Sequence, residues 1–169
     1  DLTGVSLRDA TLTGATLTDT VLINVDLSYA KLQGVDLSQL NLSGASFVGV
    51  DLRNANLSGT DLTNIILRDP ETGQDAALLT GVNLRIARLV EVDLSNLDLS
   101  HASLVGATLD NVMLRRTKLV GADLTLVNLS AADLRDADLS NARLDGADLR
   151  KANLSGVNLR DAQLNTAIM

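Results

Sequence analysis

Leucine recurs at every fifth residue along most of the chain. The first series runs from Leu2 to Leu67, with Phe47 filling one place, and the second runs from Leu79 to Leu164 and ends at Met169. Two residues before these central positions, Ala or Val predominates, as at Val5, Ala10 and Ala137. The position between is often Asp or Asn, so the repeating unit reads Ala-Asp/Asn-Leu-x-x. Such self-similarity predicts a repeat array in place of one globular core.

A period of five fits neither regular secondary structure. In an α-helix, five steps of about 100° place successive leucines about 140° apart, so they would encircle the axis instead of forming a stripe. In a flat strand, an odd period would send successive leucines to opposite faces. The remaining solution is a coil in which every fifth residue turns inward at one side of a polygon.

The glycines indicate where this coil turns. All of the glycines but one lie two residues after a central position, and Asn or Asp occupies many of the other places of this kind. These residue types tolerate a positive φ or initiate turns. Each repeat is therefore expected to end in a corner.

The repeats at residues 132–136 (ADLRD) and 147–151 (ADLRK) carry the A(D/N)LXX motif, and similar units follow one another over nearly the whole chain. In this the chain resembles the pentapeptide-repeat family. The resemblance implies an all-β fold, a right-handed quadrilateral parallel β-helix (a solenoid) with about 20 residues per coil. It also implies that the central Leu and Phe side chains form the core. The core positions expected on this basis include Leu27, Phe47, Leu67, Leu94, Leu114, Leu134 and Leu154.

The register breaks once. We expect a repeat segment over residues 1–67, a loop or bulge over residues 68–78, and a second segment over residues 79–169 that continues the same coil. The break contains the one proline of the chain, Pro70, which cannot donate a ladder hydrogen bond. It is interpreted as a tolerated surface loop, a hinge or a partner-binding loop, since some family members use such excursions for binding. Candidate contacts in it are Pro70, Glu71 and Asp75.

The charges favour a self-compensating surface. In a coil of four repeats, side chains one coil apart stack, so Asp98, Lys118 and Asp138 would alternate, with a basic cluster at Arg115 and Arg116. The resemblance also raises the alternative of a DNA mimic that binds a type II topoisomerase such as gyrase. A rod about 40 Å long would replace a duplex carrying more than about 20 charges, whereas this chain has a net charge of −7. The acidic balance also disfavours nucleic acid as a direct partner.

Several positions expected to face outward are apolar. Ile86, Val105 and Leu126 should fall together on one face, and Val48 and Ile66 should lie beside the break. Scattered apolar surface residues are ordinary. The alternative is a contact patch for a partner, to which Arg115 and Arg116 could contribute.

Candidate chemistry is sparse. The chain has one His, His101 at a turn position, and no Cys, which excludes the usual metal sites and nucleophile–base pairs. No catalytic, cofactor-binding or metal-binding residue is expected, and an enzyme is the least favoured alternative. No apolar run is long enough to insert in a membrane.

We expect a structural or interaction module of a larger bacterial, cyanobacterial-like protein. Its partner would be another protein or a flanking domain, and copies could also stack end to end.

Overall fold

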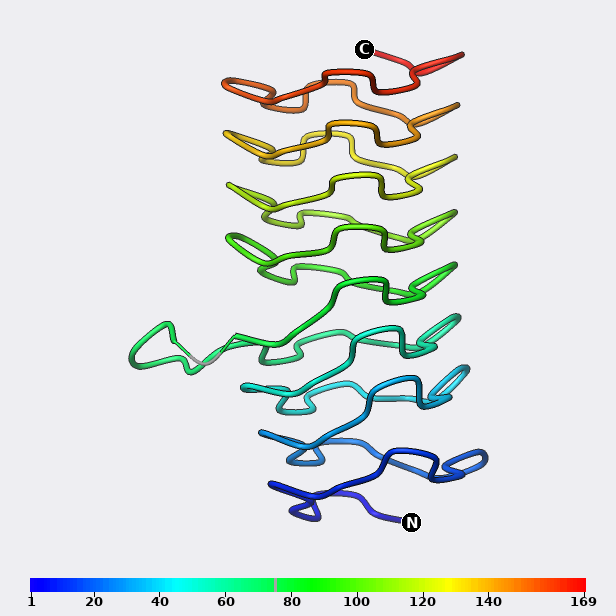
Figure 1. Ribbon diagram of the computed structural model, residues 1–169, viewed down its shortest axis with the longest axis vertical. Coiled ribbons are helices and arrows are strands. Elements are labelled where there is room, and N and C mark those ends of the chain that lie inside the picture. Colours follow the sequence, from blue (N-terminus) through cyan, green and yellow to red (C-terminus); the bar gives the residue numbers. More distant parts are fainter. Residues whose placement is uncertain (75) are drawn as a thin grey trace.

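The computed structural model describes residues 1–74 and 76–169. In these residues the backbone forms neither helices nor multi-residue strands; it alternates turns with single residues that make parallel β-bridges. Successive turns of the chain lie one above another, with the two termini at opposite ends of the stack (Figure 1). The all-β expectation is thus realised as a ladder one residue wide on each side of the coil.

One repeat shows how the sequence forms a side and a corner. Leu27 points inward and is completely buried. The side chain of Asp26 accepts a hydrogen bond from the backbone N–H of Ser28 at 2.9 Å, which is why Asp and Asn suit the place before the centre. Tyr29 adopts a φ of 60°, and the N–H of Ala30 then donates to the carbonyl of Leu27 at 3.0 Å. Ala30 is also buried.

Each coil stacks on the next with a period of four repeats. Bridges join Asp26 to Ser46 and Ser103 to Asp123, and the bridging residues recur at every fifth position, so each coil has four of them. The N–H of Leu27 donates to the carbonyl of Ser46, and the N–H of Ser46 donates to Val25, both at 2.9 Å. Each coil therefore uses its backbone donors and acceptors on its neighbours, and the leucines fill the interior of the stack.

The positions named as core from the sequence lie inside the coil. Six of the seven are buried: Leu27, Phe47, Leu67, Leu94, Leu114 and Leu134. Leu154 is partly buried and packs against this cluster. Full burial of a leucine contributes about 1.5–3 kcal/mol before the entropy cost. Many similar local contributions therefore hold the coils together.

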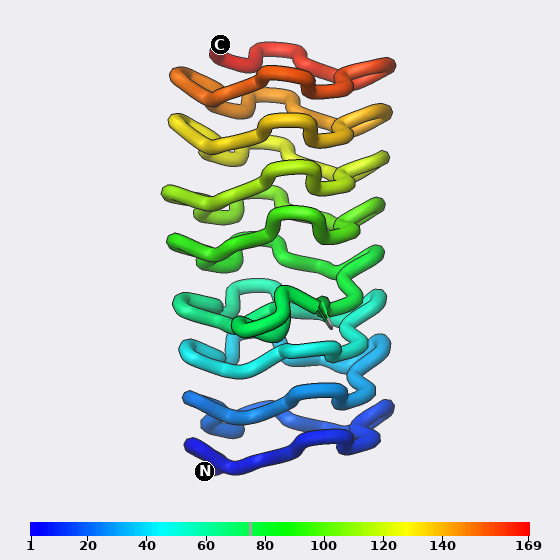
Figure 2. Tube along the Cα trace, turned by 90° about the vertical axis from the view of Figure 1, so that its left-hand side faces the viewer, coloured from blue at the N-terminus to red at the C-terminus, as the bar shows by residue number. Residues whose placement is uncertain are grey.

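The break lengthens one coil by seven positions. Bridges across it join Asp51 to Leu78 and Asn56 to Asn83, whose numbers differ by 27, whereas bridges elsewhere join numbers that differ by 20. Leu67 and Leu79 are consequently successive inward positions. The ladder resumes at Leu78, and the N–H of Ala77 donates to the carbonyl of Leu67 at 2.8 Å. The described residues 68–74 and 76, which we call the excursion, therefore project from one corner of the stack (Figures 1 and 2).

Candidate interaction site

The described residues contain no group of three or more His, Cys, Asp or Glu side chains placed to hold a metal ion. His101 is exposed at a corner, with a φ of 60°, and its ring lies over Gly121 in the next coil. Nor does the described part of the chain contain a helix that could cross a membrane.

The excursion has its own hydrogen bonds. The carboxylate of Asp69 accepts the backbone N–H groups of Glu71 and Thr72 at 2.8 and 2.9 Å; the bond from Thr72, followed by that from Glu71, lowers the pKa of Asp69. The backbone N–H of Asp69 donates to Gln74, and that of Gly73 donates to Asp69. These bonds give the excursion a defined shape that can present Pro70 and Glu71 to a partner.

Arg68 connects the excursion to the wall of the rod. One terminal guanidinium nitrogen donates to the carbonyl oxygen of Ser95. The Nε atom is enclosed, and no described residue accepts a hydrogen bond from it. A buried donor without a partner is unfavourable. Arg68 nevertheless fixes the start of the excursion to the wall through its bond to Ser95.

Two hollows adjoin at Arg68. One, of about 290 Å³, lies beneath the excursion and is bordered by Ile66, Pro70 and Asp93. The other, of about 270 Å³, continues to Met113, Arg115 and Arg116. Both share Arg68 and Asp93, so they form one depression. We call it the arginine groove and define it by the following residues: Ile66, Arg68, Asp93, Met113, Arg115 and Arg116.

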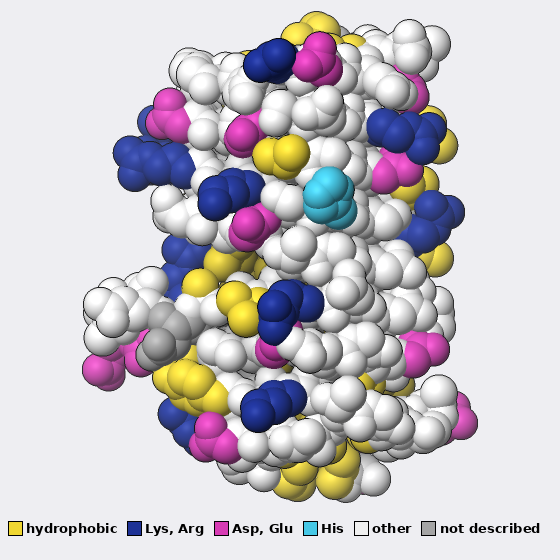
Figure 3. Space-filling model, in the orientation of Figure 1, with side chains coloured by type: hydrophobic (Ala, Val, Ile, Leu, Met, Phe, Trp, Pro, Cys, Tyr) yellow, Lys and Arg dark blue, Asp and Glu magenta, His cyan; other side chains and the backbone are white. Residues whose placement is uncertain are grey.

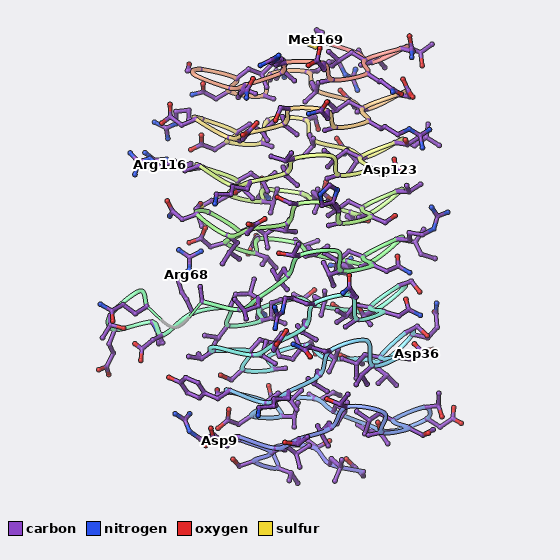
Figure 4. The ribbon with its side chains drawn as sticks, viewed as in Figure 1. Asp9, Asp36, Arg68, Arg116, Asp123 and Met169 are labelled. Atoms are coloured by element: carbon purple, nitrogen blue, oxygen red, sulfur yellow. The ribbon has the colours of Figure 1, made fainter. Side chains whose placement is uncertain are left out.

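The groove follows from the insertion. The register across the break would pair Ile66 with Asp93, yet among the described residues no bridge joins these two. The wall is thus interrupted where the chain leaves it. Figure 3 shows a recess beside the excursion with basic side chains above it. In Figure 4, Arg68 and Arg116 lie along the same edge of the rod as the excursion.

The arginines on the far side of the groove are loosely held. Arg135 binds Asp133 through two hydrogen bonds of 2.8 and 2.6 Å, and these bonds are the main cause that lowers the pKa of Asp133 to about 2. Arg115 lies 3.8 Å from the same carboxylate, and Arg116 lies 3.9 Å from Asp136. Both distances exceed a hydrogen bond, so these two guanidinium groups remain open to a further anion.

Comparison with known proteins shows the family to which this architecture belongs. The family model described as pentapeptide repeats, in eight copies, matches residues 1–39, 30–69, 77–112, 93–130 and 132–169. The chain belongs to the pentapeptide-repeat family. The matched segments leave out residue 131 and residues 70–76, a range that covers most of the excursion. Among curated protein sequences, none matches the chain.

Solved pentapeptide-repeat structures resemble the chain over most of its length. HetL, a pentapeptide-repeat protein involved in heterocyst differentiation regulation from the cyanobacterium Nostoc sp. strain PCC 7120, is 30% identical, with a TM-score of 0.51 over 100% of this chain and 91% of HetL. A trypsin-treated variant of QnrB1, a plasmid-mediated fluoroquinolone resistance protein, is 19% identical, with a TM-score of 0.71 over 97% of this chain and 77% of QnrB1. The likeness to QnrB1 concerns the fold alone.

The contact residues expected from the sequence of this pentapeptide-repeat protein divide between two corners. Pro70, Glu71, Arg115 and Arg116 lie at the corner of the excursion. Asp75 lies outside the described residues. Leu126 follows Arg116 by two repeats, half of a four-repeat coil, and therefore lies at the opposite corner.

Ile86, Val105 and Leu126 are grouped as the pattern predicted, but away from the arginines. Ile86 is 64% exposed and Leu126 is 68% exposed. Between them in the stack lies Gly106, where an added Cβ would lie 3.4 Å from Cγ2 of Ile86. These residues form an apolar corner that is separate from the groove.

Two features at and beside the groove differ from what the sequence led us to expect. Val48, expected on the surface beside the break, is buried, because it lies one coil before Arg68 and the excursion begins over it. Arg68 and Met113 were not among the expected contacts. Met113 could have been found, since it is an apolar residue at the place before a central leucine where Asp or Asn is usual. The role of Arg68 depends on the path of the excursion, which no repeat pattern specifies.

Elsewhere some charged side chains pair between coils, and others pair within a single repeat, as Arg150 does with Asp148. Arg143 lies 3.1 Å from Asp123, and Lys118 lies 3.9 Å from Asp98. Figure 3 shows basic and acidic side chains interspersed over the visible face. Exposed pairs of this kind contribute about 0–1 kcal/mol each, but they break up any continuous negative surface.

Proposed function

We propose that this pentapeptide-repeat chain is a non-catalytic protein-interaction module, and that it contacts its partner at the corner of the excursion. The proposal takes the coil to be right-handed, as the family resemblance implies. The observation that carries the proposal is the combination of two features. The excursion is held by its own hydrogen bonds, and in the groove Arg115 and Arg116 lie beyond hydrogen-bond distance of their nearest carboxylates. A regular repeat needs neither feature to close its ladder.

Capture from a lysate of the source organism, followed by reconstitution with the purified candidate, tests the function. We expect one protein to bind the purified chain directly, with a Kd of about 10 μM or tighter, as is usual for specific pairs. Binding should fall when residues 69–75 are deleted. Failure of every captured protein to bind after purification would contradict the proposal.

The alternative is a DNA mimic that binds a type II topoisomerase, favoured by the shared fold with QnrB1. The interspersed ion pairs and the net charge of −7 disfavour it, because a duplex presents a continuous row of phosphates. A DNA supercoiling assay with purified chain distinguishes the two. Inhibition of gyrase at micromolar concentration would favour the mimic.

A further inference from the structure

The arginine groove differs in charge from the rest of the molecule. The chain carries 21 acidic and 14 basic residues, yet three arginines line the groove with one aspartate, Asp93, while Asp69 lies beside it in the excursion. Both carboxylates already accept backbone N–H groups, Asp69 from Glu71 and Thr72 and Asp93 from Ser95 at 2.9 Å. The groove thus offers cationic donors in an otherwise acidic protein.

These donors point to an anionic occupant. The side chains of Arg115 and Arg116 are exposed, and the carboxylates nearest to them, at 3.8 and 3.9 Å, are beyond hydrogen-bond distance. Arginine binds carboxylates through charge-assisted, often bidentate hydrogen bonds. An occupant with carboxylates would satisfy donors that the chain leaves open.

The groove also has an apolar component. Ile66 is 40% exposed and Met113 is 44% exposed. Both stand at bridging positions, and the residues that Met113 bridges in the neighbouring coils are the aspartates Asp93 and Asp133. An apolar side chain of the occupant can cover Ile66 and Met113, and Met adapts readily to different partners. A purely ionic ligand would leave this surface in water.

Resting on the interaction function proposed above, we infer that the arginine groove binds an acidic peptide segment of the partner, with an apolar side chain next to its carboxylates. The carboxylates bind Arg115 and Arg116, and the apolar side chain covers Ile66 and Met113. Duplex nucleic acid fits less well, because the acidic remainder of the surface would repel its phosphates.

Fluorescence anisotropy with the full chain and a labelled peptide, DELDELDE, tests this inference. We expect binding that weakens as the salt concentration rises, little binding of the charge-reversed peptide KKLKKLKK, and weaker binding of DESDESDE, which lacks the leucines. Equal binding of DELDELDE and KKLKKLKK would overturn the inference. Tighter binding of a labelled DNA duplex at the same groove would also overturn it.

Charge reversal locates the site. The double variant Arg115→Glu, Arg116→Glu should weaken binding of DELDELDE about tenfold or more. Both side chains are exposed, so the variant should fold, and circular dichroism checks this. Arg85→Glu at the opposite corner is the matched control and should change binding by less than about twofold. Equal losses in the two variants would contradict a specific site.

Two further results separate this inference from the function on which it rests. A reconstituted partner that still binds the Arg115→Glu, Arg116→Glu variant would overturn the groove and leave the interaction function standing. Self-association of the wild-type chain in sedimentation experiments, abolished in the same variant, would show that a second copy occupies the groove and would overturn the peptide assignment.

Discussion

At the scale of single residues, several large corner side chains lean over a glycine in the next coil. Tyr29, Asn24 and Asp136 lean over glycines one coil later, which are Gly49, Gly44 and Gly156. Arg8 in turn lies over the ring of Tyr29, at 4.5 Å from the ring centre. At these corners, a glycine in the next coil leaves room for the large side chain.

Gly49→Ala should destabilise the protein more than Gly34→Ala does. Both glycines have a positive φ, 62° and 65°, so both substitutions carry the cost of about 1–2 kcal/mol for a left-handed residue. A Cβ on Gly49 would also lie 2.7 Å from Cδ1 of Tyr29, whereas a Cβ on Gly34 would meet nothing within 4 Å. Denaturant unfolding measures the difference, and Tyr29→Ala should abolish it. Equal effects in both variants would show that the contact is relieved at no cost.

Acid should weaken the protein as the aspartates before the central leucines become protonated. The pKa of Asp133 is lowered to about 2 from an ordinary value of 3.8, so its contribution is fully present above pH 4 and is lost as the pH falls toward 2. The Asp133→Asn variant should unfold more easily than wild type at pH 7, and the difference should shrink near pH 2. Thermal unfolding across this range tests it; a difference independent of pH would contradict it.

At the scale of elements, the sequence allowed more to be predicted about the repeats than about the interruption between them. The inward Leu134 and Phe47 could be predicted because a period of five leaves one inward position per side. The length of the insertion could not be predicted, because the spacing from Leu67 to Leu79 does not show whether these two leucines lie on successive sides of the coil. The backbone pairing of Asp51 with Leu78 settles this.

Deleting residues 69–75 should leave the rod folded. The deletion removes the seven positions by which the interrupted coil exceeds a regular one, and it joins Arg68 to Ala76, so that Leu67 and Leu79 become one repeat apart. Circular dichroism and the Tm should change little, since loops contribute few buried contacts. Deleting residues 69–73 leaves two extra residues and should lower the Tm. If the longer deletion is the more harmful, the excursion supports the fold.

At the scale of the whole molecule, stability should vary along the rod. Leucines of the middle coils are buried, whereas Leu2, Leu7, Leu159 and Leu164 are only partly buried. Each coil contacts only its neighbours, so the end coils are stabilised from one side.

Hydrogen exchange should therefore be slowest in the middle coils. Backbone amides near Leu104 and Leu124 should exchange more slowly than those near Leu7 and Leu159, because opening at an end disrupts fewer contacts. Exchange measured by mass spectrometry on proteolytic fragments resolves these segments. Uniform protection along the chain would instead indicate that the rod unfolds as one cooperative unit.

The pairing of large and small corner residues has a consequence for anyone who wishes to lengthen or shorten the rod. Because Tyr29 lies over Gly49 and Leu126 over Gly146, a graft of one, two or three repeats would keep the leucine spacing but set bulky side chains against the wrong neighbours. Whole coils are therefore the natural units of recombination. In a randomised library, substitutions tolerated together should concentrate at sites one coil apart.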